Sequence, residues 1–275
     1  MPAINDWLVS ATKQLKKCSI TSARLDAEII LAHTLKKNRT YLHAHADKLI
    51  NPADEEIAND RLGLRANHMP IAYIIGCKEF FGRRFVVTPD TLIPRPESED
   101  IISTIQSLAE QNPKLLEKKI KLIDVGTGSG CLGITLKLEF PNFDVTLSDV
   151  SQPALNIASQ NADILGVKVK TIYSNLLEDY SVKADIIVAN LPYVDPSWER
   201  SPETDYEPAS ALFADNGGLK LMIKLISQVK SNLKPDGYLI LEADPEQHPA
   251  LKVQAKQSGL KFISANNYCL VFQQV

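Results

Sequence analysis

Short apolar segments alternate with amphipathic ones after residue 120, and this alternation constrains the fold more than any other feature of the sequence. Strands are predicted at 121–125, 145–149, 169–174, 185–189 and 238–242, and helices at 131–139, 153–165, 218–233 and 249–258. Short apolar strands separated by amphipathic helices form parallel sheets that are covered on both faces. The sequence therefore predicts an α/β fold with a doubly wound sheet.

The last two strand-like segments, at 261–266 and 268–273, leave no room for a helix between them. They are expected to pair as a hairpin, so the last strand runs antiparallel to its neighbours. A doubly wound sheet with an antiparallel C-terminal strand is typical of class I methyltransferases that use S-adenosylmethionine. It differs from the all-parallel sheet that binds dinucleotides.

Residues 1–69 are predicted to form a small helical bundle. The first helix repeats apolar residues at helical spacing, namely Trp7, Leu8, Ala11 and Leu15. The second starts near Thr21 or Ser22, either of which can cap it. Its apolar face is predicted to hold Leu25, Ile29, Ala32 and Leu35, with Asp26, Glu28 and Lys36 elsewhere. A third helix is expected over 40–49, and Asn51-Pro52 opens a fourth that ends before Pro70.

The pattern changes between residues 70 and 91. The segments 79–81 and 84–88 are rich in aromatic and β-branched residues and lie on either side of Gly82. This pattern favours a hairpin. The chain is therefore expected to divide into a helical domain at 1–69, a hairpin linker at 70–91 and an α/β domain at 92–275.

The net charge of −3 is unevenly spread along the chain. Residues 1–88 hold 13 Lys or Arg against 9 Asp or Glu, which gives +4, and the remaining residues hold 17 against 24, which gives −7. A mildly basic first part favours an acidic or RNA-bearing partner, but ordinary surface charge explains it more simply. No dense basic stripe indicates an autonomous nucleic-acid binder.

Cysteine usage and hydropathy predict a cytoplasmic protein. The cysteines, Cys18, Cys77, Cys131 and Cys269, are widely spaced, as expected of free thiols in a reducing compartment. The histidines show no ligand spacing, so no metal site is expected. No apolar run approaches the ~20 residues that cross a bilayer, and residues 1–17 lack the basic start and apolar stretch of a signal peptide.

A glycine-rich loop, Gly126-Thr127-Gly128-Ser129-Gly130, follows the first strand of the predicted sheet. Glycines let the backbone approach a ligand closely, and open α/β sheets bind ligands at the carboxyl ends of their strands. Such a loop alone also suits a dinucleotide or a simple tight turn. The G-x-G-x-G spacing differs from the G-x-G-x-x-G of pyrophosphate sites. Asp124, just before the loop, would repel a pyrophosphate but suits the ammonium group of a methionine moiety.

The next two strand ends extend this predicted cofactor site. Asp149 ends the second strand, where a carboxylate accepts hydrogen bonds from both ribose hydroxyls. We favour this role over the alternative, an exposed Asp that caps the helix beginning near Ser151. The third strand ends at Asn175 and Leu176, which are expected at the edge and face of the adenine, although both also suit an ordinary loop.

The fourth strand runs into Asn190-Leu191-Pro192-Tyr193, a sequence fairly specific for methyl transfer to nitrogen on a flat, conjugated group. The carbonyl groups of the Asn190 side chain and the Leu191 main chain are predicted to accept the two N–H bonds of that nitrogen. Tyr193 is expected to stack on the group and Pro192 to fix the backbone. No separate base is required, because alkylation makes the proton acidic. The alternative is a strand followed by an ordinary turn.

With these residues in place, the chain resembles the release factor glutamine methyltransferases, the protein-(glutamine-N5) methyltransferases of bacteria and organelles. The discriminating segment is Leu92-Ile93-Pro94-Arg95-Pro96-Glu97-Ser98-Glu99, which is similar to the family's L-I-P-R-P-E-T-E. Other similar positions follow in order along nearly the whole chain, at 26–33, 70–76, Glu79-Phe80, Gly82, Glu207-Pro208, Ala211-Leu212, Gly217-Gly218-Leu219, Glu242 and Gln247.

This resemblance implies methyl transfer from S-adenosylmethionine to N5 of the glutamine in the Gly-Gly-Gln loop of a peptide-chain release factor. It implies that the helical domain and the hairpin dock the factor and that the glutamine amide meets Asn190. It also implies contacts to the cofactor or its methyl group from 126–130, Asp149 and Asn190, with Arg95 and Glu97 at the methionine end. The alternative for this last pair is a salt-bridged helix start. We expect a monomer that needs neither a membrane nor direct contact with nucleic acid.

Two departures from the family pattern keep other hypotheses open. Leu191 stands where the family usually has proline, and the arginine expected near 268–271 is absent. Asn-Leu-Pro-Tyr is also the form seen in ribosomal-RNA adenine dimethylases, so an N6-adenine methyltransferase acting on RNA or DNA is an alternative. The acidic catalytic domain argues against it, because phosphate contacts need clustered Lys and Arg. A third hypothesis is a cofactor-binding scaffold without turnover.

Overall fold

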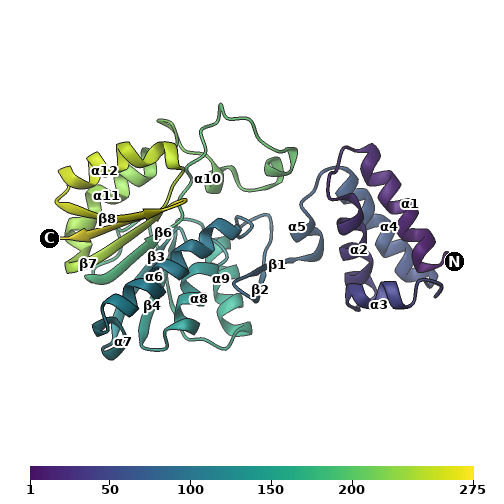
Figure 1. Ribbon diagram of the computed structural model, residues 1–275, viewed down its shortest axis with the longest axis horizontal. Helices are drawn as coiled ribbons and strands as arrows, with labels where there is room; N and C mark the ends of the chain where they lie inside the picture. The colour runs from purple at the N-terminus through teal and green to yellow at the C-terminus, as the bar shows by residue number, and fades with distance from the viewer. The chain divides into compact units, whose positions relative to one another are not determined.

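The computed structural model describes all residues from 1 to 275 and divides them into two compact units (Figure 1). Unit 1 comprises Met1–Cys77 and Arg200–Tyr206, and unit 2 comprises Lys78–Glu199 and Glu207–Val275. The segment Arg200–Tyr206 lies far along the chain from the rest of unit 1. The loop that follows the Asn190 segment therefore leaves unit 2, contributes to unit 1 and returns.

Unit 1 is the predicted helical bundle. Its helices are α1 (Ile4–Lys17), α2 (Ala23–Thr34), α3 (Arg39–Ala44), α4 (Pro52–Ala66), α5 (Ile71–Ile75) and the 3₁₀ helix η2 (Pro202–Tyr206). The predicted apolar face of α1 is buried, with Trp7, Leu8, Ala11 and Leu15 inside the bundle. Asn51 caps α4 as expected, because its side chain accepts a hydrogen bond from the Asp54 amide at 2.9 Å. Helix α3 is shorter than predicted and ends at Ala44.

The buried face of α2 differs from the prediction. Leu25 is exposed, whereas the carboxylates of Asp26 and Glu28 are buried. The reason is that arginines pair with both carboxylates: the buried Arg65 donates to Asp26 at 2.7 Å. Ser22 precedes the helix, but its hydroxyl donates to Asp26 and does not cap the helix. Hydrogen-bonded ion pairs thus take interior positions that an apolar pattern assigns to leucine.

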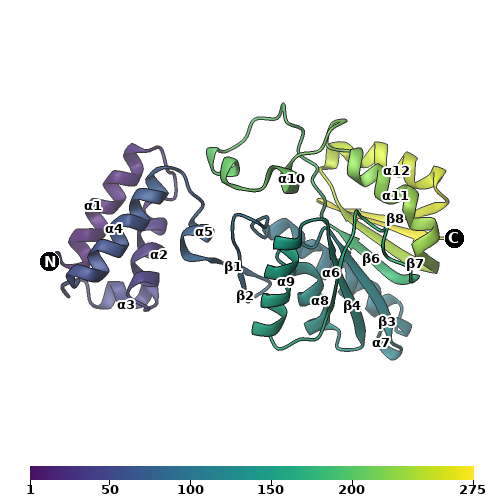
Figure 2. The ribbon, with the colours of Figure 1, turned by 180° about the vertical axis from the view of Figure 1, so that it is seen from behind.

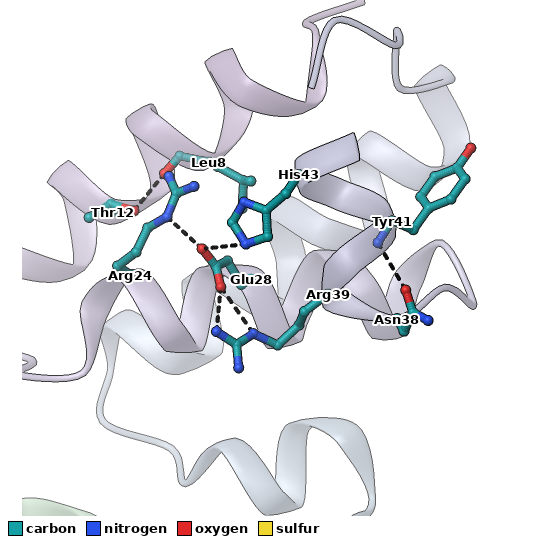
Figure 3. A network of polar contacts seen from close by, with 8 residues as sticks. All are labelled: Leu8, Thr12, Arg24, Glu28, Asn38, Arg39, Tyr41 and His43. Atoms are coloured by element: carbon teal, nitrogen blue, oxygen red, sulfur yellow. Dashed lines mark hydrogen bonds and ion pairs between the residues drawn. The ribbon is translucent and has the colours of Figure 1, made fainter. Parts of the chain in front are cut away.

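Glu28 lies at the centre of a network of polar contacts (Figure 3). Its carboxylate accepts hydrogen bonds from Arg24 at 2.7 Å and from Arg39 at 3.0 and 2.7 Å, and the His43 ring lies 3.6 Å away. Burial alone would raise the pKa of Glu28, but the hydrogen bonds from Arg39 and Arg24 outweigh it and hold the pKa below its usual value. The ionised form therefore joins α2 to α3.

A short hairpin follows α5. Its strands are β1 (Cys77–Phe80) and β2 (Arg83–Val86), and the two turn residues, Phe81 and Gly82, both have positive φ, at 48° and 69°. A two-residue turn of this kind matches the twist of a hairpin. Asn161 of α9 (Gln152–Ile164) contacts β2, because its side-chain amide accepts from the Val86 N–H at 2.7 Å and donates to the Val86 carbonyl at 2.9 Å.

Unit 2 is built on a seven-stranded sheet. Its strands are β3 (Ile120–Val125), β4 (Phe143–Asp149), β5 (Lys170–Tyr173), β6 (Ala184–Ala189), β7 (Leu233–Glu242), β8 (Leu260–Asn266) and β9 (Cys269–Gln274). The order is β5-β4-β3-β6-β7-β9-β8, and β9 runs opposite to the other six strands, so that it pairs antiparallel with both β7 and β8. The predicted doubly wound sheet with an antiparallel C-terminal strand is confirmed.

Helices cover both faces of this sheet (Figures 1 and 2). Those of unit 2 are η1 (Pro96–Ser98), α6 (Glu99–Gln111), α7 (Lys114–Glu117), α8 (Cys131–Glu139), α9 (Gln152–Ile164), α10 (Ala209–Leu212), α11 (Lys220–Asn232), η3 (Pro245–Gln247) and α12 (His248–Gln257). Helices α6, α8 and α9 share one apolar core with the sheet, and α11 and α12 share the other. The strand order reverses beside β3, where sheets of this type bind ligands.

No helix in the chain combines the length and apolar character that spanning a bilayer requires.

We predict that Glu28→Gln destabilises unit 1 by about 1–3 kcal/mol at pH 7, because the arginines lose a charged acceptor. The folded pKa of Glu28 lies below its unfolded value, so its contribution is present above about pH 4.5 and is lost as the pH falls through the folded pKa. Urea unfolding followed by Trp7 fluorescence, in a Trp198→Phe background, measures this difference. The exposed Glu56→Gln is the control, and equal midpoints for both variants at pH 7 would contradict the prediction.

Candidate functional site

A cavity of about 250 Å³ lies in unit 2 at the carboxyl ends of the parallel strands. It is lined by residues within 89–98, 126–132, 149–154, 174–176, 190–192 and 208–211, together with Leu221. Four of these segments follow β3, β4, β5 and β6, whose carboxyl ends meet at one edge of the sheet. The segments predicted to bind the cofactor and the acceptor nitrogen thus come together around one cavity.

The glycine loop after β3 forms one wall of the cavity. Gly126, Gly128 and Gly130 all have positive φ, at 72°, 55° and 82°. A Cβ on Gly126 would lie 2.8 Å from the end of the Leu191 side chain, which would have to shift, and the positive φ at 126 also favours glycine. Leu191 is buried against this glycine, and the residue that departs from the family pattern therefore has a packing role here.

Asp124 stabilises the glycine loop through hydrogen bonds and does not line the cavity. Its Oδ2 accepts hydrogen bonds from the Thr127 hydroxyl at 2.6 Å and from the Gly133 amide at 2.9 Å. Its Oδ1 is buried without a hydrogen-bond partner. Burial raises the pKa of Asp124 to about 6, against the lowering effect of these two hydrogen bonds. One carboxylate oxygen thus holds the loop to α8, and the other leaves negative charge uncompensated near the cavity.

Asp149, at the end of β4, lines the cavity, and its contact with a ribose stays a prediction. Its two oxygens accept hydrogen bonds from the Gly128 and Ser151 amides, each at 2.9 Å. Burial raises the pKa of Asp149, although these backbone hydrogen bonds oppose the effect. A carboxylate has about four lone-pair positions, so Asp149 can stabilise the loop and still accept further hydrogen bonds from a ligand. The cap of α9 itself is the Ser151 side chain.

Asn175 and Leu176 both line the cavity beyond β5. The side-chain NH₂ group of Asn175 donates to Glu178 at 3.2 Å. The side-chain carbonyl oxygen of Asn175 takes no part in that contact. Leu176 has a φ of +59°, an unfavourable conformation for a residue with a side chain. Local strain of this kind clusters at functional sites, and here it turns the backbone at the wall of the cavity.

The Asn190 segment forms the wall beside the glycine loop. Asn190, Leu191 and Pro192 line the cavity, and Tyr193 does not. The Tyr193 hydroxyl donates to Glu242 at 3.2 Å, and burial together with the charge of Glu242 raises the pKa of Tyr193 well above its usual value. Tyr193 is therefore a half-buried donor directed at Glu242 in this structure, and its stacking on the acceptor group stays a prediction.

The main chain of this segment is fixed from the far side by Gln247. Its amide donates to the Tyr193 carbonyl at 2.9 Å and to the Gly217 carbonyl at 2.8 Å. A Cβ on Gly218 would lie 1.8 Å from the Tyr193 carbonyl oxygen. The close approach of these two segments therefore requires glycine at 218.

Arg95 and Glu97 do not share one position in the structure, because only Arg95 lines the cavity. Arg95 lines the cavity and pairs with the buried Glu207, which also accepts from the Ile93 amide at 3.0 Å. Glu97 is exposed and lies outside the cavity lining. The salt bridge of Arg95 is therefore made with Glu207 and fixes the entry to η1.

Ser98 and Glu242 contact the site, but neither was predicted from its residue type to belong to it. Ser98 donates to Glu242 at 2.5 Å and accepts from the Asn190 amide at 2.8 Å. Glu242 ends β7 at the same sheet edge as Asp124, Asp149 and Asn190. A carboxylate at the end of an apolar strand was the signal that could have identified it.

Comparison with known proteins places the chain among methyltransferases. Two family models match it, the PrmC N-terminal domain at residues 6–76 and the methyltransferase small domain at residues 103–216. A methyltransferase from Pyrococcus furiosus of known structure has the same fold, with a TM-score of 0.53 and 18% identity over 78% of this chain and 98% of that one.

Two relatives of similar identity differ in how much of their length is matched. A bifunctional methyltransferase of Rickettsia conorii is 35% identical over 90% of this chain, but the chain spans only 52% of that protein. A release factor glutamine methyltransferase of Koribacter versatilis is 36% identical over 86% of this chain and 86% of that protein. This chain, matched to it over most of both lengths, belongs to the release factor glutamine methyltransferase family.

Proposed function

We propose that this chain transfers a methyl group from S-adenosylmethionine to N5 of the glutamine in the Gly-Gly-Gln loop of a peptide-chain release factor. One observation carries the proposal. Asn190 follows β6, lines the cavity and has its side-chain NH₂ group bonded to Ser98. Its carbonyl oxygen is therefore the atom available to an N–H donor in the cavity.

The chemistry of an amide acceptor explains why such an oxygen matters. The lone pair of an amide nitrogen is delocalised, so the nitrogen is a weak nucleophile. The Asn190 Oδ1 and the Leu191 carbonyl accept its two N–H bonds, orient the lone pair and stabilise the positive charge that grows on nitrogen. S-adenosylmethionine supplies an electrophilic methyl group on a sulfonium. The fixed backbone from Asn190 to Tyr193 holds both acceptors in place.

The cavity residues fit this cofactor. The glycine loop offers bare main chain, and Asp149 has acceptor positions for ribose hydroxyls. Asn175 and Leu176 provide a polar and an apolar wall at the next strand end, where we place the adenine. The uncompensated oxygen of Asp124 supplies negative charge behind the glycine loop, and this charge attracts a ligand that carries an ammonium and a sulfonium. Arg95 lines the same cavity and suits the carboxylate at the methionine end.

The substrate would be recognised outside the cavity. In this proposal the helical residues 1–69 and the hairpin linker dock the release factor, and its Gly-Gly-Gln loop enters the cavity. The match to the PrmC N-terminal domain supports a shared docking role for this region. We propose that the protein acts as a monomer in the cytoplasm and needs no direct contact with nucleic acid.

The proposal predicts that the chain labels a release factor at a single glutamine. Purified protein, labelled cofactor and a cognate factor are incubated, and the Gly-Gly-Gln peptide is examined by mass spectrometry for a gain of one methyl group. The matched control is the same factor with Gly-Gly-Ala in place of Gly-Gly-Gln. Equal labelling of the two factors would refute the proposed substrate.

Asn190→Ala is expected to lower the turnover number by ~10²–10³, because one acceptor that stabilises the developing charge is lost. The affinity for the cofactor should change far less, since the glycine loop and Asp149 remain. Steady-state kinetics and calorimetry measure the two effects separately. Asn156→Ala, at an exposed position of α9, is the control. Turnover within twofold of the wild type would show that Asn190 is not the acceptor.

Cofactor affinity is expected to fall about three- to tenfold between pH 7 and pH 5, because binding a cation favours the ionised form of Asp124. The pKa of Asp124 is raised to about 6, so the carboxylate is charged at pH 7 and mostly protonated at pH 5. Calorimetry across this range tests the sign. In Asp124→Asn the dependence should flatten, and an unchanged pH profile in that variant would assign the effect to another group.

A further inference from the structure

Glu242 is a carboxylate buried behind the candidate site, at the carboxyl end of β7. Its two oxygens accept hydrogen bonds from different segments: Oε2 from the Ser98 hydroxyl at 2.5 Å, and Oε1 from the Tyr193 hydroxyl at 3.2 Å. Glu242 does not line the cavity, whereas Ser98 and Asn190 do. Burying a carboxylate is costly unless it is hydrogen-bonded, and the hydroxyls of Ser98 and Tyr193 meet this requirement for Glu242.

The charge of Glu242 fixes the direction of the hydrogen bonds that lead to Asn190. An ionised carboxylate only accepts, and a serine hydroxyl has a single proton to donate. Ser98 gives this proton to Glu242, so Ser98 Oγ can only accept from Asn190. The group that Asn190 turns toward Ser98 must therefore be its NH₂, and Nδ2 lies 2.8 Å from Ser98 Oγ. The amide oxygen is left for the cavity.

We propose that Glu242 and Ser98 are positioning residues that set the orientation of the Asn190 carboxamide, so that its oxygen faces the nitrogen to be methylated. The inference rests on the proposed function of Asn190 and extends it to the groups behind that residue. It also explains why Tyr193 points at Glu242: a second donor on the same carboxylate keeps the carboxylate oriented for Ser98.

Removing the charge of Glu242 reverses this arrangement. A neutral carboxyl or amide group at 242 can donate to Ser98 Oγ, and Ser98 is then free to donate to Asn190. The Asn190 amide would turn its oxygen toward Ser98 and its NH₂ toward the cavity. That NH₂ would meet the NH₂ of the acceptor, so two donors would face each other and the charge-stabilising acceptor would be lost.

The surroundings of Glu242 make this charge sensitive to pH. Burial raises the pKa of Glu242 to about 6, against the hydrogen bonds from Ser98 and Tyr193; the charge of Glu97 raises this pKa further, and a hydrogen bond from the Asn190 side chain lowers it. The titratable groups that face Glu242 or its partner Tyr193 are all neutral or acidic: Glu97, Cys131, Tyr193, Tyr268 and Cys269. The methyl-transfer rate at saturating cofactor is therefore expected to decrease as the pH falls below 6.

The test compares Glu242→Gln, Ser98→Ala and Ser98→Thr with the wild type in single-turnover methyl transfer to the release factor. At saturating cofactor, Glu242→Gln and Ser98→Ala should lower the rate ~10–100-fold, less than deletion of the acceptor itself. Ser98→Thr keeps the hydroxyl and should recover most of the rate lost in Ser98→Ala. Cofactor affinity should stay within about threefold, which shows that the variants fold, and Glu110→Gln is the exposed control.

A second measurement separates this inference from the proposed function. The side-chain NH₂ signals of Asn190, assigned by loss in Asn190→Ser, report its hydrogen bonds by NMR without any substrate. They should shift between pH 7 and pH 5 in the wild type and be altered in Glu242→Gln at pH 7. If they shift but no factor is methylated, the proposed function fails and the positioning role stands. If the signals or the transfer rate are the same in Glu242→Gln as in the wild type, the positioning role is overturned.

Discussion

The hydrogen bond from Ser98 to the buried carboxylate of Glu242 is the contact on which the candidate site depends. It joins residues 144 positions apart in the sequence, and Ser98 in turn accepts from Asn190, 92 positions away. Three segments, the 3₁₀ helix η1, the loop after β6 and the end of β7, are held at one point by this chain of donors and acceptors. The direction of each bond follows from the charge of one carboxylate, and the result is an amide oxygen presented to the cavity.

Each carboxylate at this edge of the sheet connects a different pair of segments through its hydrogen bonds. Asp124 connects the glycine loop to α8, Asp149 connects the same loop to the start of α9, and Glu242 connects η1 to the Asn190 segment. Burial raises the pKa of all three. Carboxylates whose pKa values are raised by burial and that cluster beside one cavity are typical of a functional site.

Most of the fold was predictable from local sequence patterns. The wrong predictions concern residues whose contacts are made with partners farther along the chain. The strands and helices of the sheet domain were predictable because apolar periodicity and chain length act within single elements. The glycine loop, Asp149 and Asn190 were predictable as neighbours because the carboxyl ends of parallel strands share one edge. The buried face of α2 was not, since Glu28 depends on Arg39 and Asp26 on Arg65, which lie 11 and 39 residues away. The contacts of Ser98 and Glu207 likewise join residues 92 to 144 positions apart, whereas Glu242 itself had a local signal, a carboxylate at the end of an apolar strand.

The most direct test of the account is a crystal structure of the chain with S-adenosylhomocysteine and a Gly-Gly-Gln peptide. We expect the glutamine amide nitrogen to lie within hydrogen-bond distance, about 2.7–3.2 Å, of both the Asn190 side-chain oxygen and the Leu191 carbonyl. Its remaining face should point toward the sulfur of the cofactor product. A glutamine amide bound elsewhere, or an Asn190 side chain turned away from it while the peptide occupies the cavity, would contradict the account.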